Sequence, residues 1–227
     1  MAAARALITP KTFRFLRELE RNNNRDWFSE NKQRYFDEVR DPLLAFVEAF
    51  GSRLEKISEF MVADPRPNGG SLFRVYRDTR FSKDKRPYKT FAALGFRHQV
   101  GREVAGPSFY LQLEPGEIFA GAGVWHTPPD ALKQIRDAIA SDPEGWQQAT
   151  RQGKGVDPDD ERLVRPPRGY DPEHPLIEDL KRKSFTVSET FTQKDACGPG
   201  FVDAFARSCR RATPLMAFLA DAVGLDW

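Results

Sequence analysis

The feature that most constrains the fold is an alternating stretch that ends at a proline-glycine pair. Within Ser108–Glu114, Phe or Leu occupies every second position, which is the pattern of a strand with one buried face. Glu114–Glu117 then has proline at its second place and glycine at its third, as a type II turn requires. The pattern predicts an antiparallel hairpin over residues 109–122, and its apolar face needs cover from other elements.

Stretches with helical spacing of apolar residues lie on both sides of this hairpin. Before it, we predict helices over Pro10–Arg21 and from about Arg25 to Arg40, a restart or kink at Asp41-Pro42, and a helical period that continues toward Met61. After it, we predict helices over Pro128–Ala140, Glu144–Arg151 and Gly200–Val223, the last with a break near Thr213-Pro214. Further strands are predicted over Leu72–Tyr76, Phe91–His98 and Phe185–Phe191, and a surface excursion over Gln152–Pro175.

Helices, a block of strands and helices again indicate an α+β fold. We expect a mostly antiparallel sheet with a central hairpin, packed against N-terminal and C-terminal helices. The 227 residues fit one domain, 1–227. Apolar residues make up 40% of the chain and include 18 Phe, so a sizeable core is available.

The apolar stretches and the cysteines indicate in which cellular compartment the protein is expected. None of the stretches approaches the roughly 20 apolar residues that span a bilayer, and the first eight residues lack the long apolar segment of a secretory signal. Cys197 and Cys209 are too few for a disulfide scaffold. On one continuous helix they would stand about 18 Å apart, too far for a bridge. We expect a cytoplasmic protein with reduced thiols and no membrane partner.

Positive charge is concentrated in one segment. The whole chain carries +2, whereas Leu72–Lys89 has seven basic and two acidic residues, a net +5 in 18 residues. Arginine forks and lysine ammonium groups suit phosphates and carboxylates. We therefore predict a site for a phosphate-bearing or other anionic ligand here: a nucleotide, a phosphosugar or a nucleic-acid backbone. The candidate ligand-binding residues are Arg74, Tyr76, Arg77, Arg80, Lys83, Lys85, Tyr88 and Lys89.

Two other hypotheses fit the same segment. In the first, the protein is an enzyme acting on such a ligand, with Asp78 as general base or metal ligand and Lys32 or Arg77 stabilising developing charge. In the second, Arg77 and Asp78 form an internal clasp, and the domain is a structural or protein-interaction module. The clasp hypothesis predicts that Arg77→Ala costs several kcal/mol, as does breaking a buried ion pair.

The sequence carries no evident cofactor motif. His98, His126 and His174 show no metal-ligand spacing, no C-x-x-C is present, and no glycine-rich nucleotide loop follows a strand. Asp78, Asp84 and Glu114 would suit Mg²⁺ if they converged. Acids interleaved with arginines more often form ion pairs, so no metal site is assigned.

Three smaller patterns leave alternatives open. Trp125 either packs into the space beside Gly121 and Gly123, or those glycines leave room for a ligand. One face of the hairpin carries a polar row of Tyr110, Gln112 and Glu114. This row either forms the floor of a pocket or faces solvent. Lys32 either extends along an apolar stripe to reach solvent or a carboxylate, or faces the same pocket as the basic segment.

The segment Phe73–Thr90 reads FRVYRDTRFSKDKRPYKT. It resembles the signature F-R-x-Y-R-D-x-R-F-S-K-D-K-x-P-Y-K-T of a widespread uncharacterised "domain of unknown function" family of bacteria, fungi and plants. Asn24–Phe28 and Gly121–Trp125 add to the resemblance, which covers nearly the whole chain. It implies no activity. Arg86 stands where that signature more often has a small or polar residue, so it is left out of the candidate set.

Overall fold

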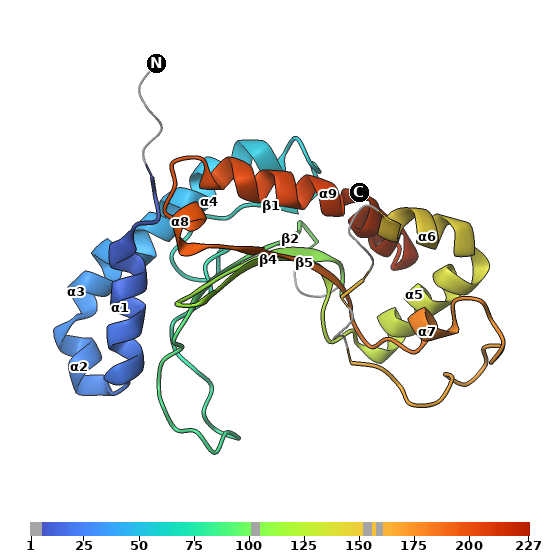
Figure 1. Ribbon diagram of the computed structural model, residues 1–227, viewed down its shortest axis with the longest axis horizontal. Helices are drawn as coiled ribbons and strands as arrows, with labels where there is room; N and C mark the ends of the chain where they lie inside the picture. Colours follow the sequence, from blue (N-terminus) through green and yellow to red (C-terminus); the bar gives the residue numbers. More distant parts are fainter. Residues whose placement is uncertain (1–5, 101–104, 152–155, 158–160) are drawn as a thin grey trace.

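The computed structural model describes residues 6–100, 105–151, 156–157 and 161–227. Its centre is a five-stranded antiparallel sheet in the order β1-β2-β3-β4-β5 (Figure 1). The strands are β1 (Met61–Val62), β2 (Ala92–His98), β3 (Ser108–Glu114), β4 (Glu117–Val124) and β5 (Phe185–Phe191). The predicted hairpin is confirmed as β3–β4, and Gly116 has the positive φ of 94° that its turn needs.

Two long helices cover one face of the sheet, as Figure 1 shows for α4 (Asp41–Leu54) and α9 (Phe201–Ala222). Their aromatic side chains meet those of β2 in the core. The ring of Phe50 lies 4.7 Å from that of Phe96 and 4.8 Å from that of Phe205. This layering confirms the α+β prediction, with N-terminal and C-terminal helices packed on a mostly antiparallel sheet.

The N-terminal helical region is more broken than predicted. After α1 (Pro10–Arg21), the expected helix from Arg25 to Arg40 divides into α2 (Arg25–Glu30), α3 (Lys32–Tyr35) and a π-helical turn, η1 (Phe36–Arg40). Asn31 interrupts it, because its side-chain amide donates to the carbonyl of Trp27 at 2.9 Å and ends α2. The restart at Asp41 is confirmed. The helical period toward Met61 is wrong, since α4 ends at Leu54 and Met61 begins β1.

The C-terminal helix corrects a second prediction. Pro214 lies inside α9, which runs unbroken, so the predicted break near Thr213-Pro214 is wrong. Cys209, Ala212, Leu215 and Met216 are all buried on both sides of that proline. Continuous packing of this face against the sheet outweighs the hydrogen bond that proline removes. The remaining helices are α5 (Pro129–Ser141), α6 (Pro143–Arg151), α7 (Ile177–Leu180) and α8 (Gln193–Ala196).

Two further segments complete the fold. Leu72–Tyr76 is not a strand, because it makes only the isolated bridges Leu72–Leu94 and Tyr76–Tyr88. Of the predicted excursion Gln152–Pro175, residues 152–155 and 158–160 lie outside the described part, and the remainder runs along the surface beside α5 and α7 (Figure 1). Within the described ranges, no helix combines the length and the apolarity that a bilayer span requires.

Candidate functional site

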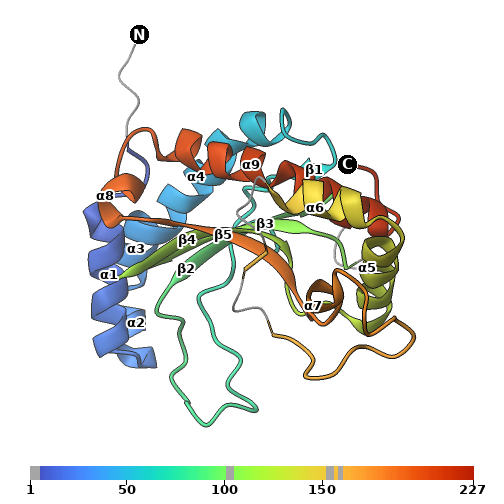
Figure 2. The same cartoon turned by 45° about the vertical axis from the view of Figure 1, so that its right-hand side comes forward.

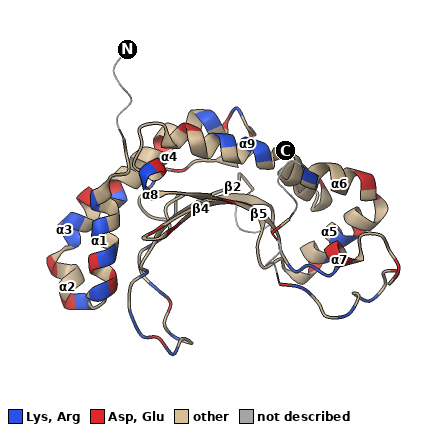
Figure 3. Cartoon of the chain, in the orientation of Figure 1, with Lys and Arg blue, Asp and Glu red and all other residues tan. Residues whose placement is uncertain are grey.

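The basic segment forms a projecting arm, which we define as residues 73–90. It leaves the sheet beside β2, extends away from the face that α4 and α9 cover, and returns to begin β2 (Figures 1 and 2). In both views the arm lies beside α1–α3. The arm therefore places its charges on the side of the sheet that the two long helices leave open (Figure 3).

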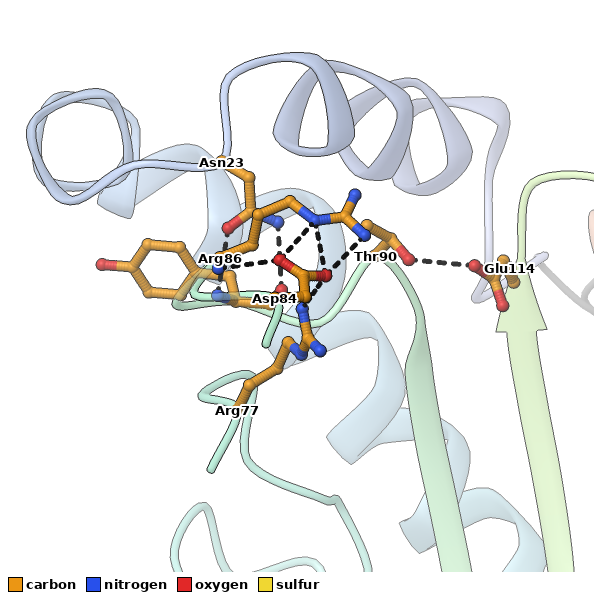
Figure 4. Close-up of polar contacts among 7 residues, drawn as sticks. Asn23, Arg77, Asp84, Arg86, Thr90 and Glu114 are labelled. Carbon is orange, nitrogen blue, oxygen red and sulfur yellow. Dashed lines mark hydrogen bonds and ion pairs between the residues drawn. The ribbon is translucent and has the colours of Figure 1, made fainter. Parts of the chain in front are cut away.

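The base of the arm is a short two-stranded ribbon. The N–H of Arg77 donates to the carbonyl of Pro87 at 2.9 Å, and the N–H of Lys89 donates to the carbonyl of Val75 at 2.8 Å. Asn23, which precedes α2, brackets Tyr88: its amide donates to the Tyr88 carbonyl and accepts from the Tyr88 N–H, both at 3.0 Å (Figure 4). These contacts fix the base of the arm to the corner between α1 and α2.

The two candidate tyrosines have different surroundings. Tyr88 is buried, and its ring stacks on Phe28 with the centroids 4.1 Å apart. Tyr76 lies opposite Tyr88 in the ribbon and is 50% exposed. Tyr88 therefore contributes to the base of the arm, whereas the ring of Tyr76 is accessible to a ligand.

The two aspartates of the arm form ion pairs with arginines. Asp78 pairs with Arg80 at 2.7 Å. Asp84 pairs with Arg77 at 2.6 Å and with Arg86 at 2.7 Å (Figure 4). Each aspartate also accepts a hydrogen bond from the main-chain N–H of the residue two positions later in the sequence. Each therefore forms a tight Asx turn. Hydrogen bonds from Arg80 lower the pKa of Asp78 to about 2, and those from Arg86 and Arg77 hold the pKa of Asp84 well below its ordinary value.

Four of the six candidate cations have no carboxylate partner among the described residues. Arg74 and Lys83 are exposed, and Lys85 donates only to the carbonyl of Thr79, at 2.9 Å. The ammonium group of Lys89 is half-buried between two rings, 5.4 Å from the centroid of Phe73 and 5.6 Å from that of Phe91. Burial, and then the nearby Arg74, lower the pKa of Lys89.

The polar row predicted on β3 joins the arm to the open face of the sheet. Tyr110 donates to Gln112 at 2.9 Å, and Gln112 donates to Glu114 at 3.1 Å. The hydroxyl of Thr90 donates to Glu114 at 2.9 Å (Figure 4). Burial, and then Glu114, raise the pKa of Tyr110 to about 12. The row is thus a hydrogen-bonded network of a neutral tyrosine, an amide and one carboxylate, and it lies half-buried beside the base of the arm.

The two candidate catalytic residues lie apart from this row. Asp78 is ionised and bound to Arg80, and a carboxylate with a pKa of about 2 is a weak general base at neutral pH. Lys32 is exposed on α3, where its ammonium group lies 5.8 Å from the ring of Phe36. No contact joins it to the arm in the part of the chain that the structure describes. In that same part, no three His, Cys, Asp or Glu side chains gather as a metal site.

Of the two alternatives for the glycines of β4, the packing of Trp125 beside them is wrong. Trp125 is 72% exposed and its ring lies tilted against that of His126, so it does not fill the space beside Gly121 and Gly123. Gly123 has a φ of 127°, and a Cβ there would lie 2.0 Å from the carbonyl oxygen of Phe185. Glycine is required at this position because the main chain of β5 comes so close.

A cavity of about 450 Å³ lies between α9 and strands β4 and β5. Its charged lining residues, Glu189 and Arg211, pair with each other. Burial raises the pKa of Cys209, the thiol in its wall. The rest of the lining is mostly small, and no described charge in it lacks a partner, so the arm is the better candidate site.

Two features of the site escaped the sequence analysis. Asn23 belongs to a run of three asparagines that predicts helix capping, and nothing local indicates a partner 65 positions away. Phe81 is an aromatic residue among the cations of the arm, and the sequence does not indicate how exposed it is. At the tip of the arm it is 96% exposed, with the guanidinium of Arg80 5.8 Å from its ring centroid.

The fold and the arm together define an α+β protein with an antiparallel sheet, one face of which is covered by helices and the other flanked by a basic projection. The family model described as "Conserved hypothetical protein (DUF2461)" matches residues 11–218. The chain belongs to this family, and the matched range includes the whole arm and the polar row. No curated protein matches the chain.

Proposed function

We propose that the arm binds a phosphate-bearing ligand. The observation that carries this proposal is the set of cations that form no ion pair with a carboxylate in the described part of the chain: Arg74, Lys83, Lys85 and Lys89. Lys89 matters most, because a half-buried ammonium group without a counter-charge is unfavourable and an arriving anion would relieve that cost. Arg77 and Arg80 support the arm through their aspartates.

The exposed aromatic rings favour a ligand that contains a nucleobase. Phe81 and Tyr76 present accessible rings on the same arm as the unpaired cations. Proteins that bind single-stranded nucleic acid combine these two features, a basic track for the backbone and aromatic side chains on which bases stack. A phosphosugar would use the cations and leave both rings uncovered.

The contacts give less support to the other two hypotheses. The Arg77 and Asp84 side chains are 27% and 36% exposed, and an ion pair this open to solvent contributes little to the free energy of unfolding. The clasp hypothesis needs several kcal/mol from Arg77, whereas Asn23 and Tyr88 hold the base of the arm. The enzyme hypothesis needs a poised base, and the ion pair with Arg80 keeps Asp78 from that state.

Fluorescence anisotropy tests the proposal directly. A labelled single-stranded oligonucleotide is titrated with the protein at two salt concentrations, and mononucleotides and sugar phosphates are added as competitors. The informative variant is Lys83→Ala, and Lys56→Ala is its matched control, an exposed lysine after α4 and outside the arm. We expect Lys83→Ala to weaken binding and to reduce the salt slope by about 1, as the loss of one phosphate contact does. The control should bind as the wild type does.

Phe81→Ser separates base stacking from phosphate binding. Loss of one stacked base costs about 1–3 kcal/mol, so oligonucleotide binding should weaken while competition by sugar phosphates stays unchanged. Failure of every phosphate compound to bind would contradict the proposal. Equal losses in Lys83→Ala and Lys56→Ala would also contradict it, because binding would then reflect overall charge.

A further inference from the structure

Three buried polar atoms belong to residues that contact one segment at the end of the sheet away from the arm. Among the described residues, the buried side-chain nitrogen and oxygen atoms without a hydrogen-bond partner are Thr127 Oγ1, Arg136 Nε and Arg162 Nε. Such atoms are rare in native proteins, and each calls for an explanation. None of them belongs to the arm.

All three residues contact the same short segment, Arg182–Lys183. Arg136 Nη2 donates to the carbonyl of Arg182 at 3.0 Å, and the N–H of Thr127 donates to the carbonyl of Lys183 at 3.2 Å. Arg162 lies opposite Arg182 in an isolated bridge. Thr127, which follows β4, and Arg136 on α5 therefore both contact the main chain at two consecutive residues.

This cluster is distant from the arm. Thr127 follows β4, Arg136 lies on α5, and Arg182 follows α7. Figure 2 places α5 and α7 at the end of the sheet away from α1–α3, beside which the arm hangs. A function of the cluster is therefore independent of the one proposed for the arm.

Arg136 is a buried charge without a counter-charge. Only 9% of the residue is exposed, and no described carboxylate pairs with it. The neighbouring Asp137 is bound by Lys133 at 2.5 Å and by Tyr170 at 2.8 Å. Burial lowers the pKa of Arg136. Arg182, which is 6% exposed, shows the usual arrangement, because Asp179 pairs with it at 2.9 Å.

The main chain next to Thr127 is held in an unusual conformation. His126 has a φ of 49°, the sole positive φ of a non-glycine residue in the described ranges, and its N–H donates to the hydroxyl of Ser184 at 3.0 Å. Conformations of this kind cluster at binding and catalytic sites. Trp125 and His126 are exposed, so solvent reaches the surface immediately beside the buried cluster.

We propose that the Arg136 guanidinium and the Thr127 hydroxyl bind one oxyanion group, a phosphate or a carboxylate. Both unpartnered groups can donate a hydrogen bond, and Arg162, which also pairs with Glu178 at 3.9 Å, carries a further unpartnered Nε–H opposite Arg182. An oxyanion accepts several such bonds and neutralises the buried charge. A bound water would satisfy one hydrogen bond and leave the charge of Arg136 uncompensated.

The test is the thermal stability of the full chain in inorganic phosphate and in acetate, against chloride at equal ionic strength. Isothermal titration calorimetry then gives the dissociation constant of the anion that stabilises. The variants are Arg136→Met and Thr127→Val, and the control is Lys133→Met, an exposed position on the same helix. We expect the anion to raise the melting temperatures of the wild type, of the control and of the arm variant Lys83→Ala by the same amount. Arg136→Met and Thr127→Val should bind the anion at least tenfold more weakly.

The comparison of phosphate with acetate decides which oxyanion the cluster takes. The proposal is overturned if neither anion raises the melting temperature of the wild type above that in chloride. It is also overturned if the shift persists in Arg136→Met, or in Thr127→Val where Arg136→Met does not fold. Thr127→Val keeps the branched shape of the side chain and removes only the hydroxyl, so its fold should survive.

Discussion

Asn23 acts at the base of the arm as a neighbouring strand would. Its side-chain amide presents one donor and one acceptor in the same plane, as a peptide group does, and both reach the main chain of Tyr88. The adjacent Asn24 has the predicted role of an N-cap, accepting the N–H of Trp27 at 2.9 Å. Two asparagines side by side in the sequence thus serve unlike purposes.

Replacement of Asn23 should destabilise the protein. Asn23→Ala leaves the N–H and carbonyl of Tyr88 without those partners in a part-buried position, at a cost of about 1–3 kcal/mol in the free energy of unfolding. Urea denaturation measures this loss. Asn22→Ala is the matched control, because the Asn22 amide donates only to the exposed carbonyl of Glu18. Equal effects in the two variants would rule out the bracketing role.

Single residues also show where local signals succeed. An aspartate two places before an arginine occurs at Asp64, Asp78, Asp84 and Asp160, of which the last lies outside the described residues. In the other three the aspartate pairs with that arginine and accepts its N–H. This spacing accounts for two ion pairs of the arm, Asp78–Arg80 and Asp84–Arg86, and not for Arg77–Asp84. What it leaves open is which cations remain without a carboxylate, because that depends on how the arm folds back on itself.

At the scale of elements, the pairing of β4 with β5 depends on one glycine. Gly123 combines a positive φ with the close approach of the Phe185 carbonyl. Two positions earlier, Gly121 has ordinary space, since a Cβ there would lie 3.8 Å or more from its neighbours. The sequence pattern G-A-G-V therefore contains one glycine that is required and one that tolerates a side chain.

Gly123→Ala should cost about 3 kcal/mol or more, because it adds backbone strain to a clash with β5. Gly121→Ala should change the free energy of unfolding by no more than about 1 kcal/mol. Chemical denaturation of the two variants provides the comparison. Equal stability of the two would show that β5 can move away without loss, and the assignment of Gly123 would be wrong.

Elements were predictable where one local pattern governs them. The β3–β4 hairpin, α1 and the restart at Asp41 follow from alternation, spacing and proline chemistry. The π-helical turn Phe36–Arg40 and the unbroken α9 do not, because tertiary packing decides both. The same holds for Met61, whose apolar side chain fits a helix period and a strand equally well.

At the scale of the whole molecule, Phe205 joins three separate segments. Its ring centroid lies 5.9 Å from Phe46, 4.8 Å from Phe50 and 5.7 Å from Phe96. The two covering helices and the sheet therefore share one core. The single domain that the length predicts stays a prediction, and cooperative unfolding tests it.

We expect one unfolding transition, in which far-ultraviolet circular dichroism and tryptophan fluorescence coincide. Phe205→Ala should lower the free energy of unfolding by about 3–5 kcal/mol and move both signals together. Phe218→Ala, a half-buried position on the same helix, should cost less. Two separable transitions, or a Phe205→Ala shift in one signal alone, would contradict the single-domain prediction.

The order of the strands has a consequence for synthesis on the ribosome. Neighbours β4 and β5 are separated in the chain by the sixty residues from 125 to 184. At about 5–20 residues per second, β4 waits roughly 3–12 s for its partner to be made. During that interval the nascent polypeptide carries an unpaired strand edge, the kind of surface that chaperones shield. The small residues Ala120–Gly123 in the middle of β4 offer few side-chain contacts to any other strand that pairs with this edge.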